Sequence, residues 1–266
     1  MKILFSLCLF LLGSLAGFSQ ENSRDTLRIL CYNIHYGQGN DGVYELERLA
    51  EVIRESKPDI VALQEVDVVV ERSGKVHQAR KLGELTGMAV RYGPTQHYQG
   101  GLYGNAVLTN LPILDVLIHP LPYTEATPEK TTYPRAAIAV TVKGPEGNPV
   151  RFISTHFQHN VEEDRIEQAK AINQLFAGDE IPSILAGDMN AVPGSEPINL
   201  LEKKWIHAGK EPFAPTAPSK DPRSRIDYIF YRPASSFEVI SEKVIDEPMA
   251  SDHCPVFSEL KLRPSN

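Results

Sequence analysis

The stretch "SDHCPVFSEL" at residues 251–260 places a carboxylate and an imidazole directly before a hydrophobic strand. Adjacent residues of a strand point to opposite faces, so Asp252 and His253 are not expected to bind each other. At the mouth of a strand, however, both side chains can reach into one cleft. An isolated Asp-His pair is more often a polar turn before an edge strand. The pair therefore indicates a site only if other parts of the chain complete it.

The rest of the chain alternates apolar strands with amphipathic helices. The spacing of apolar residues predicts helices over 44–57, 77–87 and 162–176, and a glycine-rich aromatic loop over 92–104. Apolar runs between turn residues predict strands over 26–36, 59–66, 105–109, 135–142, 150–157, 183–190, 225–232, 237–245 and 255–260. Roughly nine or ten strands with a few helices predict an α/β fold in which two mixed or antiparallel sheets stack and helices pack outside.

The first 19 residues differ from the rest. "MKILFSLCLFLLGSLAGFSQ" has an early Lys2, then an apolar run, then small residues before Gln20. This order is typical of a secretory signal peptide and is too short for a membrane span. We expect residues 20–266 to form one exported domain, periplasmic or secreted. No second long apolar run follows, so we expect no transmembrane segment.

Charge and cysteine content narrow the choice of partners. The chain has 27 Lys and Arg against 34 Asp and Glu, a net charge of −7. Nucleic-acid binding depends on cationic residues that neutralise phosphates, so a nucleic acid partner is possible but not favoured. We expect a monomer. Beyond the signal segment, Cys31 and Cys254 are too few for a disulfide scaffold. One bridge is conceivable, and two unpaired buried thiols are the favoured interpretation.

Polar residues of a few types recur where hydrophobic strands begin or end. They are Asn33, Glu65, His156, Asp188, Asn190, Asp227, Asp252 and His253. A single acid at a strand end is usually a solvated turn, but repetition of one mixture is harder to explain in that way. Carboxylate and amide oxygens suit a hard cation such as Mg²⁺. Zinc would require cysteines or clustered histidines, and that spacing is missing.

Seven motifs in order carry a resemblance to a known family. They are "YNIHYG" (32–37), "LQEV" (63–66), "GNAVLT" (104–109), "STHF" (154–157), "GDMN" (187–190), "RIDYIF" (225–230) and "SDHCPV" (251–256). Together they resemble the endonuclease/exonuclease/phosphatase superfamily, which includes DNase I-like nucleases, inositol polyphosphate phosphatases and sphingomyelinases. The resemblance covers nearly all of the chain after the signal segment. It implies a four-layer, DNase I-like α/β sandwich with the site at one edge of the two sheets.

The resemblance implies a metal centre of Mg²⁺, with Mn²⁺ as a possible substitute. Glu65 resembles the main metal ligand, and Asn33 and Asp252 resemble the residues that assist it. His35 stands where some relatives carry a second acidic ligand. This departure favours one tightly bound metal ion over two.

The same resemblance implies the catalytic groups. Asp188 resembles the residue that orients or deprotonates the attacking water, and Asn190 the residue that holds the phosphate or the water. Asp227 resembles the partner of His253, which fixes its tautomer and favours its protonated form. His156 resembles the second histidine, across the scissile phosphate. These groups suit in-line attack of water on a phosphoester.

Three further residues are candidates for substrate contact. Arg135 in "YPRAAIAV" begins a strand among uncharged neighbours, where a phosphate contact and an ordinary ion pair are about equally favoured. Arg72 in "VVVERSGK" lies on a loop that could reach the cleft, although a solvated loop is the favoured interpretation. Asn105 opens a strand after the glycine-rich loop and could touch substrate.

Other functions compete with that of an Mg²⁺-dependent phosphodiesterase. "GQGNDG" at 37–42 matches a dinucleotide-binding pattern, but polar "NIHY" precedes it and Asp41 would lie beside the pyrophosphate. A non-catalytic binding module would tolerate the loss of Glu65, Asp188 or His253, yet every motif position is filled. The resemblance to the exported bacterial branch, and to proteins that remodel glycosylphosphatidylinositol anchors, favours a small, lipid-headgroup or inositol-type phosphodiester. A DNase-like nuclease is the alternative.

Overall fold

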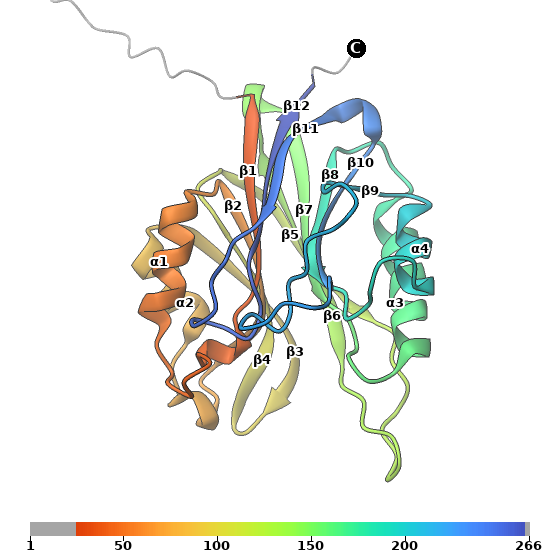
Figure 1. The fold of residues 1–266 in the computed structure, drawn as a ribbon. Helices are drawn as coiled ribbons and strands as arrows, with labels where there is room; N and C mark the ends of the chain where they lie inside the picture. The colour runs from red at the N-terminus through yellow and green to blue at the C-terminus, as the bar shows by residue number, and fades with distance from the viewer. Residues whose placement is uncertain (1–24, 264–266) are drawn as a thin grey trace, which may run out of the picture.

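The computed structural model describes residues 25–263, which form two six-stranded sheets stacked face to face (Figure 1). The first sheet has the order β11 (Phe237–Val244), β12 (Val256–Leu262), β1 (Thr26–Asn33), β2 (Ile60–Val68), β4 (Gly101–Thr109), β3 (Ala89–Tyr98). The second has the order β5 (Ile113–Leu121), β6 (Arg135–Lys143), β7 (Pro149–His156), β8 (Ser183–Asp188), β10 (Asp227–Arg232), β9 (Ile206–His207).

Each sheet contains one parallel pair, and each pair is joined by a helix. β1 and β2 are parallel and are connected through α1 (Leu46–Ser56), while β7 and β8 are parallel and are connected through α3 (Glu162–Phe176). Parallel neighbours require such a crossover, and the other pairs are antiparallel. The carboxyl ends of both parallel pairs therefore lie at one edge of the sandwich, the lower edge in Figure 1.

The helices cover the two outer faces and complete four layers. α1 and α2 (Gln78–Thr86) pack on the first sheet, and α3 and α4 (Glu196–Glu202) pack on the second (Figure 1). Leu49 and Ile53 of α1 share a buried cluster with alternate residues of β1, Leu30 and Tyr32. The intervening β1 residues face the other sheet, because side chains alternate along a strand. Both faces of β1 are thus apolar, as expected for a central strand.

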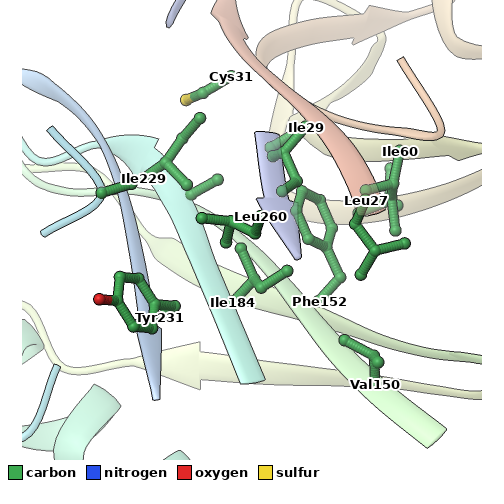
Figure 2. Packing of buried hydrophobic residues seen from close by; sticks show 14 of the residues in the cluster. Leu27, Ile29, Cys31, Ile60, Val150, Phe152, Ile184, Ile229, Tyr231 and Leu260 are labelled. Carbon is green, nitrogen blue, oxygen red and sulfur yellow. The ribbon is translucent and has the colours of Figure 1, made fainter. Parts of the chain in front are cut away.

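The core between the sheets is built from those intervening residues. Leu27, Ile29 and Cys31 of β1 meet Phe152 of β7 and Ile184 of β8 (Figure 2). All five are at most 2% exposed. This layer fixes the distance between the sheets, and with it the distance between the side chains at the shared edge.

The predicted loop over 92–104 is wrong. β3 continues to Tyr98 and β4 begins at Gly101, so the segment is a β-hairpin whose turn is Gln99 and Gly100, both with positive φ. Partial exposure along β3 and the bulge between Pro94 and Gln96 weaken the alternation that would have indicated a strand. β5, β9 and α4 were also not predicted, which raises the number of strands to twelve within residues 25–263.

Three other expectations concern the signal segment, membrane-spanning helices and the two cysteines. The predicted signal peptide, residues 1–19, lies outside the described residues. Within 25–263 no helix is both long and apolar enough to span a membrane. Cys31 and Cys254 are buried free thiols, which confirms the favoured interpretation over a bridge.

A half-buried histidine outside the cleft lining makes stability depend on pH. The His207 ring packs on Phe213 and Phe230, with ring centroids 4.2 and 5.2 Å apart, and its Nδ1 accepts a hydrogen bond from the Gly209 N–H at 2.7 Å. Burial, reinforced by the positive charge of Arg225, lowers the pKa of His207 to about 3. The folded state therefore holds this imidazole neutral.

We predict that His207→Asn reduces the loss of stability on acidification. The pKa of histidine in the unfolded state is about 6.5. Between that pH and the folded pKa the unfolded state binds the extra proton, so stability falls as pH falls. At pH 5 the wild type should lose about 1–2 kcal/mol from this group. Urea unfolding at pH 7 and pH 5 measures it, with the exposed His97→Asn as control. Equal losses in wild type and His207→Asn would contradict the assignment.

Candidate active site

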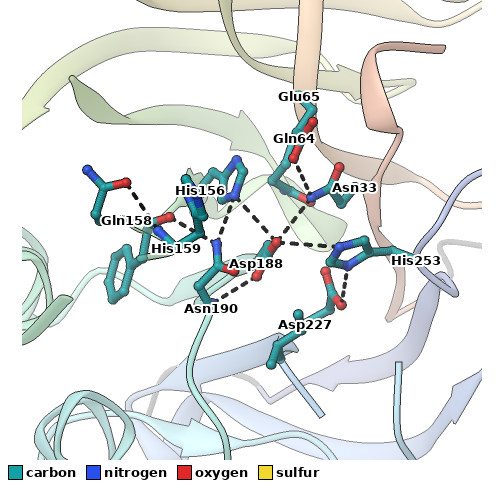
Figure 3. A network of polar contacts seen from close by, with 12 residues as sticks. Asn33, Gln64, Glu65, His156, Gln158, His159, Asp188, Asn190, Asp227 and His253 are labelled. Carbon is teal, nitrogen blue, oxygen red and sulfur yellow. Dashed lines mark hydrogen bonds and ion pairs between the residues drawn. The ribbon is translucent and has the colours of Figure 1, made fainter. Parts of the chain in front are cut away.

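The predicted polar residues come together at the edge where the parallel strands end. Asn33 ends β1 and His156 ends β7, while Asp188 ends β8 beside His156 in register. Asp227 begins β10, the antiparallel neighbour of β8, and pairs with Asp188. His253 lies just before β12. Each of these strand termini therefore contributes one polar residue to the same edge of the sandwich (Figure 3).

The Asp188 carboxylate is the centre of this group (Figure 3). Its Oδ2 accepts a hydrogen bond from Asn33 Nδ2 at 3.0 Å, and lies 3.4 Å from His156 Nε2 and 3.9 Å from His253 Nε2. Its Oδ1 accepts the backbone N–H of Asn190 at 2.8 Å. Asp188 is 1% exposed. Burial and the neighbouring charge of Asp227 raise the pKa of the Asp188 carboxyl, although His253 and these hydrogen bonds oppose the rise.

The glycine of "GDMN" allows β8 to approach β7. A Cβ at Gly187 would lie 2.1 Å from the Thr155 carbonyl oxygen. Any other residue would push the two strands apart at the position next to the pair formed by His156 and Asp188. Gly187 is therefore required by backbone proximity, and it sets the spacing of the two catalytic candidates.

His253 is held by Asp227. The His253 Nδ1 lies 2.9 Å from Asp227 Oδ2, and both side chains are buried. Burial lowers the pKa of His253, but the charges of Asp227, Asp188 and Asp252 outweigh it and leave the pKa well above its usual value. This geometry agrees with the expected pairing of Asp227 with His253.

His156 has a different environment from His253. Its Nδ1 accepts a hydrogen bond from Arg135 Nη1 at 3.0 Å, so in the neutral ring the proton is on Nε2. Nε2 faces Asp188 Oδ2, and Asn190 Nδ2, which donates to the Phe157 carbonyl, lies 3.0 Å from Nε2. Burial, together with the charge of Arg135, lowers the pKa of His156 well below its usual value. His253 thus lies among acids, whereas His156 lies beside the cation Arg135.

Two site residues have strained backbones. Glu65 lies in a bulge of β2 with φ of 58°, and Asn190 follows β8 with φ of 48°. Positive φ is unfavourable for residues other than glycine and clusters at functional sites. The bulge breaks the β2 alternation at Glu65, which lines the cleft.

Two groups of side chains could hold a cation. Asp188, Asp227 and His253 have ligand atoms within 4.8 Å of one another, but His253 Nδ1 is engaged with Asp227. Glu65 instead faces the cleft, and its Oε1 lies 3.3 Å from Asn33 Nδ2. Asp252 is partly exposed, 3.8 Å from His35 Nε2. A carboxylate that faces the cleft suits Mg²⁺ or Mn²⁺ better than a histidine already bound to an acid. Asn33 turns its Nδ2 towards Glu65, and its Oδ1, the atom that could ligate a cation, accepts the His35 N–H.

Part of this group lines a cleft of about 290 Å³, and Asn33, Asp227 and Asp252 lie outside its lining. The sequence predicted seven of the residues that line it, namely Glu65, Arg72, Arg135, His156, Asp188, Asn190 and His253. Gln96, Tyr133 and His159 were missed. His159 follows His156 closely in "STHFQHN", and Tyr133 directly precedes "PR", so proximity to predicted site residues was the available signal.

The three candidates for substrate contact lie in different environments. The favoured interpretation of Arg72 as part of a solvated loop is wrong, because Arg72 lines the cleft and its guanidinium makes two hydrogen bonds of 2.9 Å to the buried Asp67. Arg135 lines the cleft and is 5% exposed. Asn105 is 2% exposed, donates to the Ala136 carbonyl at 2.9 Å, and is not among the lining residues.

Comparison with known proteins places this arrangement in a class of phosphoester-cleaving enzymes. Residues 30–253 match the Endonuclease/Exonuclease/phosphatase family, which is more than half of the chain, and the protein therefore belongs to this family. Its members hydrolyse phosphoester bonds and typically depend on a divalent metal. The predicted resemblance and the predicted DNase I-like sandwich are confirmed.

Particular relatives share most of their length with this chain. The uncharacterized protein YbhP of Escherichia coli (strain K12) is 25% identical, covering 91% of this chain and 99% of the relative. The endonuclease/exonuclease/phosphatase crystal structure from Beutenbergia cavernae DSM 12333 is 27% identical with a TM-score of 0.72, covering 90% of this chain and 72% of that one. Bacteroides thetaiotaomicron mannosyl-6-phosphatase Bt3783 shares the fold at 22% identity and a TM-score of 0.71, covering 88% and 99%.

We predict that Glu65→Gln leaves the fold intact and weakens binding of Mg²⁺ or Mn²⁺. The amide keeps the shape of the side chain but removes the charge that attracts the cation. The loss should exceed the roughly 10–100-fold cost of removing a residue that only supports a ligand. Calorimetric titration measures the affinity, and Glu71→Gln, an exposed neighbour outside the cleft lining, is the matched control. Wild-type affinity in Glu65→Gln would refute the metal assignment.

Proposed function

We propose that this protein is an exported, Mg²⁺-dependent phosphoesterase that hydrolyses a small phosphodiester, such as a lipid headgroup or an inositol phosphate, by in-line attack of water. The observation that carries the proposal is the convergence on Asp188. An amide from the end of β1, an imidazole from the end of β7 and an imidazole from the segment before β12 point at one carboxylate oxygen in a cleft that Glu65 also lines. A structural ion pair would not need so many donors around a single acid.

The side chains divide the work of hydrolysis. Asp188 orients the attacking water and accepts its proton, because its Oδ2 faces the cleft residues. His253, held through Nδ1 by Asp227, presents Nε2 to the phosphoryl oxygens. His156, held through Nδ1 by Arg135, presents Nε2 from the other side. Asn190, fixed by its bonds to Asp188 and to the Phe157 carbonyl, positions the phosphate or the water. Donors fixed in advance stabilise developing charge without reorganisation.

Glu65, with Asn33 and Asp252, would hold the metal ion. When bound, Mg²⁺ supplies neutralisation of the phosphoryl charge. Asn33 has a second task, because its Nδ2 contacts both Glu65 Oε1 and Asp188 Oδ2 while its Oδ1 accepts the His35 N–H at 3.1 Å. Asn33 therefore ties the metal-binding side of the cleft to the side that prepares water.

The dimensions of the cleft favour a small substrate over a polymer. A volume of about 290 Å³ is at the lower end of the range for small-molecule sites. The net charge of −7 also disfavours electrostatic steering of nucleic acid. Bt3783, which shares the fold, is named a mannosyl-6-phosphatase, so phosphomonoesters belong in the test as well.

The proposal predicts metal-dependent turnover. The mature protein should hydrolyse soluble phosphodiesters or phosphomonoesters with Mg²⁺ or Mn²⁺, and EDTA should abolish the activity. The panel should contain bis(p-nitrophenyl) phosphate, p-nitrophenyl phosphate, glycerophosphoinositol, phospholipid vesicles and plasmid DNA. Asp188→Asn is the inactive control. If EDTA leaves turnover unchanged, or if DNA is cleaved faster than every small ester, the proposal fails.

A double-mutant cycle tests whether Asp227 and His253 act as one unit. His253→Ala should lower kcat by about 10²–10⁴-fold, the scale of a positioned proton-transfer group. Asp227→Asn should cost less, because the ring remains. The double variant should cost far less than the product of the two separate losses, because both changes disable the same group. Strictly multiplicative losses in kcat would show that the two residues act independently.

A further inference from the structure

The strand at one edge of the second sheet, β5, exposes an apolar segment. β5 pairs with β6 on one side, and within residues 25–263 no strand pairs with its other side. Leu114, Leu117 and Ile118 are 55%, 48% and 43% exposed, and the centre of the strand, 116–118, carries no charge. A long apolar edge strand presents free N–H and C=O groups and is a template for pairing with another strand.

The other three edge strands of the described residues are protected against such pairing. β9 has only two residues. β3 is interrupted by a bulge and exposes Arg91. β11 has a bulge of its own and exposes Glu238 and Lys243. Short strands, bulges and charges are the usual devices against edge-to-edge association. In β5 the irregularity lies at Leu114, so residues 115–121 pair regularly with β6 and leave a regular free edge.

The side chains of β5 alternate between the two faces of the second sheet. His119 packs on Phe176 of α3 on the outer face, with ring centroids 5.2 Å apart, whereas Val116 packs against the core between the sheets. Pro120 has no N–H, and proline in an edge strand fits where its nitrogen faces away from the neighbouring strand. Val116 and Ile118 share this alternation, so their N–H and C=O groups face the free edge as well.

We propose, in place of the monomer expected from the sequence, that β5 pairs antiparallel with β5 of a second copy of this chain about a twofold axis at Leu117. Residue 116 then lies opposite residue 118 of the second copy, and residue 115 opposite residue 119. Apolar side chains meet on both faces, with Leu117 against its own copy and Val116 against Ile118. The Asp115 carboxylate lies opposite the His119 imidazole, which can donate a hydrogen bond to it.

The complementarity of Asp115 and His119 selects this register. An axis at Val116 or at Ile118 would place Asp115 opposite an apolar leucine, and an axis at Asp115 would place two carboxylates opposite each other, which is destabilising. With the axis at Leu117, Val116 and Ile118 exchange main-chain hydrogen bonds with the second copy, and the second sheets of both copies join into one continuous sheet. The interface is isologous and closes after two subunits, as in most soluble oligomers.

The affinity of the dimer is the first test. One strand pair is a small interface, so we expect a concentration-dependent dimer with a Kd of about 1–100 μM. Sedimentation velocity of the mature protein from about 1 to 300 μM measures it. Leu117→Lys places two ammonium groups beside each other at the axis and should raise the Kd at least about tenfold. A wild type that is monomeric throughout, or a Leu117→Lys variant with the wild-type Kd, would overturn the proposal.

Ile240→Lys is the matched control for this substitution. Ile240 is an apolar residue of another edge strand, β11, and is 52% exposed. The control should keep the wild-type Kd, because the added charge lies away from β5. A loss of dimerisation in Ile240→Lys as large as that in Leu117→Lys would show that added charge alone prevents association, and would also overturn the proposal.

Cysteine cross-linking tests the register. Residues that face each other in a non-hydrogen-bonded antiparallel pair have Cα atoms about 4.5 Å apart, within reach of a disulfide. Mild oxidation should therefore link two copies of Leu117→Cys. Leu114→Cys is the matched control on the same strand, because its two copies would lie roughly 20 Å apart along the paired strands. Cys31 and Cys254 are buried, so the wild type should not link. Equal linking of both variants would contradict the register.

A charge exchange tests the polar pair. Asp115→Lys should raise the Kd about three- to tenfold, because two symmetric pairs are lost. Adding His119→Asp should restore most of the affinity, since the acid and the base then change places. A double variant that dimerises no better than Asp115→Lys would refute the pairing. His119 contacts Phe176, so circular dichroism checks the fold, and cross-linking carries the test if the double variant does not fold. None of these measurements uses catalysis, so their outcome is independent of the proposed function.

Discussion

The site depends on two carboxylates that are buried directly opposite each other. Asp188 and Asp227 pair across β8 and β10, and each is 1% exposed. Like charges directly opposite on neighbouring strands are destabilising. The arrangement is held by donors that approach from other elements, with Asn33 and the Asn190 N–H on one acid and His253 on the other. The polar residues at the sheet edge are therefore interdependent, because removal of any donor leaves a buried acid less compensated.

The topology explains why these residues come from strand ends. Each sheet has one parallel pair joined by a helix, so Asn33, His156 and Asp188 come from carboxyl ends. Their antiparallel neighbours begin at the same edge, so Asp227 and His253 come from strand beginnings or just before them. A polar residue at the boundary of an apolar run is visible in a single sequence. This is why the layered fold and the position of the polar residues could be predicted without a structure, whereas the roles of the acid–base group came from the resemblance to the family.

The cleft walls could not be predicted in the same way. Gln96 lies in a hairpin whose exposed, bulged strand lacks clean alternation, and Tyr133 lies in a segment without periodicity between β5 and β6. The environment of Arg72 depends on Asp67, five positions away, which lies just past the predicted strand 59–66 and belongs to β2 in the structure. Whether an arginine is paired or unpaired is a three-dimensional property. The sequence accordingly left the ion pair and the phosphate contact equally open for Arg135.

The strained backbones of Glu65 and Asn190 also depend on the residues around them. Glu65 and Asn190 adopt left-handed conformations that cost about 1–3 kcal/mol each and persist only when the surroundings determine them. Asn190 is fixed because its N–H binds Asp188 and its amide binds the Phe157 carbonyl. Glu65 is fixed because the strand pairing on both sides of its bulge is intact. The fold therefore loses some stability at the two positions whose side chains must point into the cleft. A sequence optimised only for folding would place glycine at both positions, and it would lose the carboxylate and the amide that give the cleft its chemistry.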